Sequence, residues 1–287
     1  PPNVAEPASL VTIVPTEKGE PGSAFPYPEL VEIREKQQSL AAVGAVFPFV
    51  PANIGDGVTA RREWGWLVTA NYFDLLGIRP YLGRGFLAGE DAPGAAPAIL
   101  LSHRLWQDRF GADPAVVGRE ILFNGRNTRV VGVAPPGFHG HEAALTADYW
   151  LPLSMLDRIP FPKGGYNLLN DRVYSWFWPV ARLRPDVSIA QANAEFAVIA
   201  AQFRATDPAR WKERGFYVER AGQLQAGLRR IFSVFFGALL AVAFMVLLIA
   251  CSNVANLLLA RGASRLSESA TRLAIGAGRG RLHRLLV

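Results

Sequence analysis

Residues 231–260 read IFSVFFGALLAVAFMVLLIACSNVANLLLA and contain no charged residue and no histidine. A helix needs about 20 apolar residues to cross the ~30 Å hydrocarbon core of a bilayer. A buried helix of a large soluble core is the alternative, but such helices seldom stay apolar on every face over this length. The stretch therefore predicts a membrane helix over about residues 231–258.

The arginines around this helix predict its direction. Only Arg229 and Arg230 lie just before it, whereas six arginines and one glutamate follow in residues 261–287. Positive flanks stay in the cytoplasm, so we expect residues 261–287 to be cytoplasmic and residues 1–230 to lie outside, in a periplasm or an extracellular space. Residues 1–260 hold 24 Lys and Arg against 23 Asp and Glu, so most of the net charge of +6 comes from the tail. A nucleic-acid-binding protein would spread its basic surface over the folded domain, and we expect no nucleic-acid partner.

Small and amide residues within the membrane helix predict contacts with other helices. Gly237 and Ala241 form a small-xxx-small pair, which lets a second helix approach closely. Asn253 and Asn256 lie three residues apart and share a face. An amide in hydrocarbon needs a partner, usually on another helix. Alternatively, the two asparagines lie in the head-group zone and bind water.

The tail carries an apolar stripe followed by glycines. The stripe lies on one face of an expected helix, and Gly276 begins the glycines that would end it. A juxtamembrane helix held by anionic lipid is one interpretation, and a helix docked in the groove of a partner is the other. The residues alone leave both open. The stripe consists of Leu266, Ala270, Leu273, Ala274 and Ala277.

The outer region predicts two β-α-β units separated by an insertion. Residues 1–24, rich in Pro, Gly and Glu, are expected to be a tether that leads into structure and includes the first strand, and the second unit contains a Ser188/Gln191 capping box. Together they suggest a split ferredoxin-like subdomain with a mixed α/β insertion over about 59–172, so that the fold class is an α+β domain followed by a membrane helix. The expected elements are strands at 9–14, 40–50, 174–183 and 215–220, with helices at 28–38 and from 189 onward.

The insertion has its own local signals. Ser102 is the expected N-cap of a helix at 103–110, and Gly77 ends an expected short helix at 71–76. Asn124-Gly125 predicts a type I′ hairpin between strands at 119–123 and 128–133. Further strands are expected at 61–68 and 98–101.

Motifs for catalysis are absent from the sequence. It has no Walker A loop and no Gly-x-Ser-x-Gly elbow, and its one cysteine, Cys251, excludes a disulfide framework. His139, His141 and Glu142 have side chains of the kind that bind zinc, but they follow Pro-Pro-Gly in a loop, which favours solvated loop residues. We expect no enzyme activity and no cofactor. The seven tryptophans all precede residue 212 and are expected in the core and at its rim rather than in a ligand cage.

Several motifs in order resemble the periplasmic core domain of MacB-like ABC transporter permeases. The start of an FtsX-like permease domain follows, and the amino-acid sequence of these motifs resembles most the acidobacterial branch of duplicated orphan permeases. The resemblance covers about residues 8–287. It rests on Asn71–Gly77, Gly83–Phe86, Leu101–Trp106, Phe110-Gly111, Val117–Arg119, Asn124-Gly125 and Val130–Pro135 in the outer region, and on Ile249–Arg261 and Arg272–Ala277 at the C-terminal side.

The resemblance implies a permease subunit in the bacterial inner membrane without its own ATPase site. Its domains would be a periplasmic core domain over 1–228 and the start of the FtsX-like domain over 229–287, with a cytoplasmic coupling segment at about 261–280. Such permeases have further membrane helices on both sides of the periplasmic domain, so this chain is expected to be a fragment. The residues implied in ATPase coupling are Leu266, Glu268, Ala270, Arg272, Leu273, Ala274, Gly276 and Ala277.

The expected function is to couple a cytoplasmic ABC ATPase to the periplasmic domain, for export or extraction of a substrate. Expected partners are that ATPase, other permease helices or a second permease copy, membrane lipid, and a periplasmic partner. Ser267-Glu268-Ser269 departs from the more charged run of relatives, which bears on the strength of ATPase docking. A single-span receptor with a periplasmic ligand-binding domain is the alternative, and a metal-dependent hydrolase using His139, His141 and Glu142 is a third.

Overall fold

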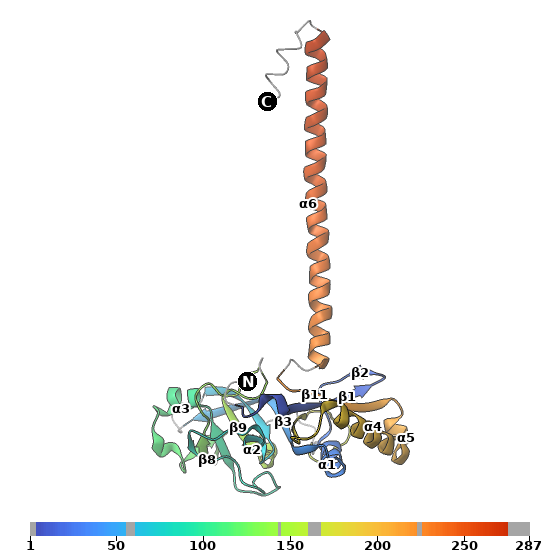
Figure 1. Ribbon diagram of the computed structural model, residues 1–287. Helices are drawn as coiled ribbons and strands as arrows, with labels where there is room; N and C mark the ends of the chain where they lie inside the picture. Colours follow the sequence, from blue (N-terminus) through green and yellow to red (C-terminus); the bar gives the residue numbers. More distant parts are fainter. Residues whose placement is uncertain (1–3, 56–60, 143–144, 160–167, 223–225, 275–287) are drawn as a thin grey trace. The chain divides into compact units, whose positions relative to one another are not determined.

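The computed structural model describes residues 4–55, 61–142, 145–159, 168–222 and 226–274. The chain divides into two compact units, Pro1–Leu228 and Arg229–Val287. The first unit is built on a mixed sheet with helices, and the second on one long helix, α6 (Figure 1).

The outer strands of the first unit form the expected ferredoxin-like arrangement. The strand order is β11-β1-β10-β3, and every neighbouring pair is antiparallel. This order results when two β-α-β units pack side by side, so the split ferredoxin-like prediction is confirmed. Its elements are β1 (Leu10–Glu17), α1 (Tyr27–Lys36), β3 (Leu40–Gly55), β10 (Trp178–Leu183), α4 (Ile189–Thr206) and β11 (Arg214–Arg220).

The segment between β3 and β10 extends the same sheet. From β3 the order continues β4-β9-β6-β8-β5, with parallel pairs between β4 and β9 and between β6 and β8. Strand β7 pairs with both β8 and β3, so the pairings return to β3. The inserted elements are β4 (Arg61–Val68), α2 (Tyr72–Leu76), β5 (Leu82–Gly83), β6 (Ala98–Leu101), α3 (His103–Phe110), η2 (Pro114–Val116), β7 (Glu120–Phe123), β8 (Arg126–Val133), β9 (Tyr149–Pro152) and η3 (Leu153–Arg158).

Strand β3 is shared by both parts, which explains its length of 16 residues. Its first half pairs with β10, and its second half pairs with β4 and β7. The register against β4 shifts between Phe47 and Val50. The intervening Pro48 and Phe49 form a bulge where β3 passes from one part to the other.

The sheet buries an apolar cluster on each face because its side chains alternate. On β6, Ile99 and Leu101 join one cluster, and Ala98 and Leu100 join the other. The first cluster also receives the apolar faces of α1, α3 and α4, whereas the second receives α2. Helix α4 lies beside α5 (Pro208–Trp211) and against β11 (Figure 1).

Local signals in the sequence act as expected. The Ser188 hydroxyl caps α4 in a complete capping box, and Ser102 accepts from Leu105 N–H at the start of α3. Gly77 ends α2 with a left-handed φ of 67°. Asn124 and Gly125, with φ of 48° and 77°, join β7 and β8. The strand expected from residue 174 is shorter, since β10 begins at Trp178.

The predicted tether is wrong for the part of it that the structure describes. A 3-10 helix, η1 (Pro7–Ser9), leads into β1, and β2 (Glu20–Pro21) pairs back on β1. Val4 is buried, and Ala5 N–H donates to the carbonyl oxygen of Leu76. The Arg182 guanidinium donates to the backbone of Ala5 and to the Ser9 hydroxyl. An arginine 173 residues from Ser9 and 177 from Ala5 in the sequence thus fixes this segment, which local composition cannot reveal.

Candidate functional site

The second unit presents an apolar helix without apolar surroundings. Helix α6 runs from Ala226 to Ala274, and its segment Ile231–Ala263 has a mean hydropathy of 2.9. None of the most apolar window is buried against the described protein. A helix this apolar and this exposed requires lipid or other helices around it. At 33 residues the segment exceeds the predicted span at 231–258.

The residues predicted to pack against other helices all lie within this exposed segment. Gly237 and Ala241 are one turn apart, and no described atom lies within 4 Å of where a Gly237 Cβ would be. Asn253 and Asn256 are likewise exposed. Their role in packing stays a prediction, because the described residues contain one membrane-length helix and the predicted contacts need another.

The predicted coupling residues belong to the same helix as far as Ala274. The helical backbone includes Leu266, Glu268, Ala270, Arg272, Leu273 and Ala274. Their spacing at i, i+4, i+7 and i+8 places Leu266, Ala270, Leu273 and Ala274 on one face. Gly276 and Ala277, with the predicted glycine break, lie outside the described residues. The assignment of these residues to ATPase coupling stays a prediction.

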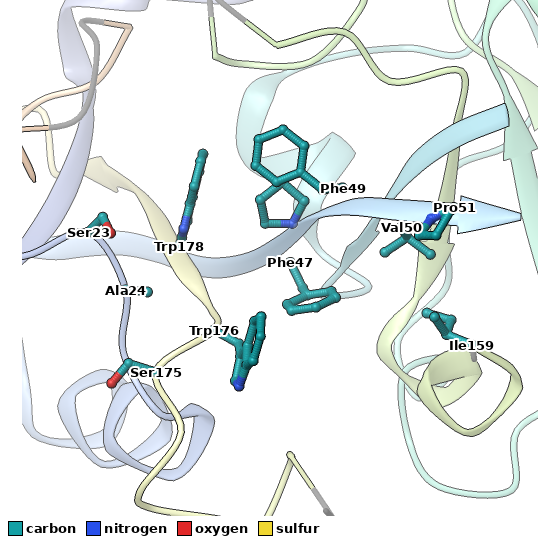
Figure 2. Close-up of a pocket in the computed structure, with 11 residues that line it drawn as sticks. Ser23, Ala24, Phe47, Phe49, Val50, Pro51, Ile159, Ser175, Trp176 and Trp178 are labelled. Atoms are coloured by element: carbon teal, nitrogen blue, oxygen red, sulfur yellow. The ribbon is translucent and has the colours of Figure 1, made fainter. Parts of the chain in front are cut away.

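A hollow of about 420 Å³ lies at the β3 bulge of the first unit (Figure 2). Aromatic rings from β3 and from the start of β10 form its walls. Trp176 packs edge-to-face against Phe47 with ring centroids 5.6 Å apart, and Trp178 against Phe49 at 6.0 Å. The described residues lining the hollow are Ser23, Ala24, Phe47, Pro48, Phe49, Val50, Pro51, Ile159, Ser175, Trp176 and Trp178.

Phe49 also borders a second, smaller hollow of about 300 Å³. That hollow is lined by Trp64 and Trp66 of β4 and by an ion pair between Arg104 and Asp148. The Arg62 guanidinium lies 5.5 Å from the Trp64 ring centroid, a cation–π contact. Phe49 therefore separates an uncharged hollow from one with charged residues.

A buried ion pair joins α1 to the last strand of the domain. The Glu29 carboxylate is fully buried, and Arg210 and Arg214 both donate to it, with Arg214 Nη1 at 2.9 Å from Oε1. Arg214 also stacks over Trp211 at 4.8 Å. Because a buried carboxylate is costly unless paired, these contacts hold β11 firmly against α1.

The expectation of solvated loop residues at 139–142 is wrong for His141 and Glu142. His139 is exposed, but His141 is buried and its Nδ1 lies 3.1 Å from the Tyr72 hydroxyl. Burial lowers the pKa of His141 to about 3 and raises that of Tyr72 well above its usual value. The neutral ring packs edge-to-face on Trp66. His139 and His141 thus differ in environment, and the described residues contain no cluster of three metal-ligating side chains.

Sequence reasoning missed the aromatic hollow. Phe47-Pro48-Phe49-Val50-Pro51 was available as a signal, because proline inside a strand marks a bulge. Of the tryptophans expected in the core and its rim, Trp176 and Trp64 are exposed and both border a hollow. Nothing local indicated that Trp176 and Phe47, 129 residues apart, would meet.

Residues 2–199 match the model of the MacB-like periplasmic core domain. Among curated proteins, none matches this chain in sequence. Similar solved structures include a domain assigned to a permease protein of Porphyromonas gingivalis, at 16% identity and a TM-score of 0.56, covering 79% of this chain and 99% of that one. The periplasmic region of MacB from Actinobacillus actinomycetemcomitans shares 14% identity at a TM-score of 0.52, covering 80% of this chain and 94% of that one.

A third structure, the extracellular domain of the noncanonic ABC-type transporter YknZ from Gram-positive bacteria, has 14% identity and a TM-score of 0.50. It covers 72% of this chain and 98% of that one. These similarities show the same fold. The chain belongs to the MacB-like periplasmic core domain family. With the apolar helix α6 after that domain, it is a membrane protein with a periplasmic segment, a MacB-like ABC transporter permease.

Proposed function

We propose that this permease couples a cytoplasmic ABC ATPase, supplied as a separate chain, to the movement of its periplasmic domain in the bacterial inner membrane. The observation that carries the proposal is the continuity of α6. One helix of 49 residues, about 74 Å at 1.5 Å per residue, extends from the domain boundary through the apolar span to the coupling stripe.

Contacts of β11 within the first unit support transmission of force through the periplasmic domain. Strand β11 lies directly before α6 in the chain, with residues 221–225 between them. The Glu29 pairs hold β11 to α1, and seven residue pairs join β11 to β1. A displacement of β11 would therefore move the ferredoxin-like part as a body. A partner shifts the equilibrium between two conformations of the permease only if it binds them with different free energies. In this proposal the ATPase is that partner.

The cytoplasmic end offers the matching contact. The helical backbone groups Leu266, Ala270, Leu273 and Ala274 on one face, as docking in a groove requires. A helix held by anionic lipid would depend on arginine charge instead, at about 1 kcal/mol per residue. The two mechanisms thus respond to different substitutions.

The test compares a bulky substitution on the apolar stripe with a bulky substitution away from it. Ala274→Trp in the full chain, expressed in its own host, should abolish ATP hydrolysis that co-purifies with the permease, because overpacking costs about 1–3 kcal/mol. Ser264→Trp, which the helical spacing places off the stripe, and Arg265→Gln should retain it. If Arg265→Gln and Arg272→Gln remove the activity while Ala274→Trp is silent, the tail is a lipid anchor. Absence of co-purifying hydrolysis in the unmodified protein would favour the single-span receptor.

A further inference from the structure

The hollow at the β3 bulge has no charged side chain among its described lining. Its polar side-chain groups are the hydroxyls of Ser23 and Ser175 and the indole N–H groups of the tryptophans. The rest of the lining is aromatic, aliphatic or proline. Desolvating an ion without a partner is costly, so this lining disfavours a charged ligand and suits an uncharged one.

The backbone of Phe49 is strained. Its φ of 62° lies in the left-handed region, which a bulky residue rarely adopts. Such a residue costs about 1–3 kcal/mol and persists at ligand clamps and other functional sites. The conformation leaves the Phe49 side chain 53% exposed, whereas glycine would adopt the same φ without strain. The exposed ring contributes little burial to the core and is available for contact with a ligand.

The rings are placed to receive an aromatic group. Figure 2 shows Trp178 beside Phe49 and Trp176 beside Phe47 at the hollow, and each pair is in edge-to-face contact. Trp176 is 44% exposed. Edge-to-face and offset contacts between rings contribute about 0.5–1.5 kcal/mol beyond apolar burial. A flat aromatic ligand in the hollow would contact both the faces and the edges of these rings.

The size of the hollow favours a small molecule over a protein. Small-molecule sites have volumes of about 300–1,000 Å³, and this one has about 420 Å³. It is lined by 11 described residues, whereas a standard protein interface needs about 20–30 residues on each side. The volume of the hollow is thus that of a small-molecule site.

We propose that Phe49, Trp176 and Trp178 form a binding site for an uncharged aromatic small molecule on the periplasmic domain. The bulge in β3 creates the site by turning Phe49 outward, and the charged hollow on the other side of Phe49 lies outside it. The site belongs to the domain itself and does not depend on the proposed ATPase coupling.

The test uses the full chain in phosphatidylcholine nanodiscs and the photoreactive probe benzophenone. We expect benzophenone to label peptides that carry Phe49 or Trp176, and 4-benzoylbenzoate, its carboxylate analogue, to label them far less. Phe49→Gly and Trp176→Ala should each lower this labelling about tenfold at subsaturating probe, equivalent to ~1.4 kcal/mol. Tyr81→Ala, which removes another exposed ring packed on His103, should leave it unchanged.

Thermal unfolding of Phe49→Gly separates binding from folding. Because glycine relieves the strained φ, its Tm should equal or exceed that of the unmodified protein while labelling is lost. Labelling confined to α6 would overturn the proposal, as it would show partition of the probe into lipid. Equal labelling by the carboxylate analogue would overturn the selection for uncharged ligands. A lower Tm for Phe49→Gly would make the ring a structural element and would equally overturn the proposal.

Discussion

Two buried side chains, His141 and Tyr149, show how single residues adapt to the interior of this domain. Tyr149 donates to the carbonyl oxygen of Val50 at 2.6 Å, and its ring lies against Gly65, where a Cβ would come within 2.3 Å of the ring. Gly65 is therefore required for close packing of β4 on β9. His141 instead stays neutral, because burial lowers its pKa to about 3, and its Nδ1 lies within hydrogen-bond distance of the Tyr72 hydroxyl.

We predict that His141 makes the domain less stable in acid. Its folded pKa of about 3 lies below the ordinary 6.5. Between these values the unfolded chain binds a proton that the folded chain does not, so stability is fully present above pH 6.5 and falls as the pH decreases. The loss from pH 8 to pH 5 should be about 2 kcal/mol, measured by urea unfolding followed by tryptophan fluorescence.

The variant His141→Asn isolates this contribution. Asparagine can still bond the Tyr72 hydroxyl but does not titrate, so the pH dependence should decrease by that amount. His139→Asn, at the exposed neighbour, should keep the full dependence. Equal slopes for His141→Asn and the unmodified protein would contradict the prediction.

At the scale of elements, the ion pairs of Glu29 with Arg210 and Arg214, which join α1 to α5 and β11, can be tested by substitution. Glu29→Gln leaves Arg210 and Arg214 without a counter-charge. Removing one partner of a buried pair costs about 3–5 kcal/mol, and the arginine side chains are 24% and 20% exposed, which reduces the cost. We expect a loss of about 2–4 kcal/mol in the free energy of unfolding.

Glu32→Gln, one turn further along α1, is the matched control. Its pair with Arg172 is more exposed, so the same substitution should cost about 1 kcal/mol or less. Since all seven tryptophans lie at residues 64–211, their fluorescence reports unfolding of this domain. A similar cost for both variants would show that the Glu29 pair does not hold α1 to β11.

At the scale of the whole molecule, the charge distribution predicts the topology. In a Cys251→Ala background, Ala197→Cys on the exposed side of α4 should react with an impermeant maleimide in intact spheroplasts. Ser264→Cys should react only after permeabilisation, because the arginine-rich side stays in the cytoplasm. Labelling of residue 264 but not of residue 197 in intact spheroplasts would reverse the orientation.

The sequence alone determined the class of the molecule and most of its elements. Hydropathy gave the membrane helix, periodicity and caps gave α3 and α4, and Asn124-Gly125 gave the β7–β8 turn. These features depend on interactions within a few residues along the chain, so each can be predicted from a short stretch of sequence. The ferredoxin-like order was also predictable, because two β-α-β units pack in few ways.

Only the tertiary structure decided the return of the strand pairings to β3, the burial of His141, the pairing of Glu29 and the aromatic hollow. Each depends on residues that are distant in sequence, such as Glu29 and Arg214 or Phe49 and Trp178. Burial and pKa are properties of the surroundings that folding brings together, and the residue types were compatible with exposed positions as well. The composition of the loop therefore predicted a solvated His141, whereas in the folded domain its side chain is buried.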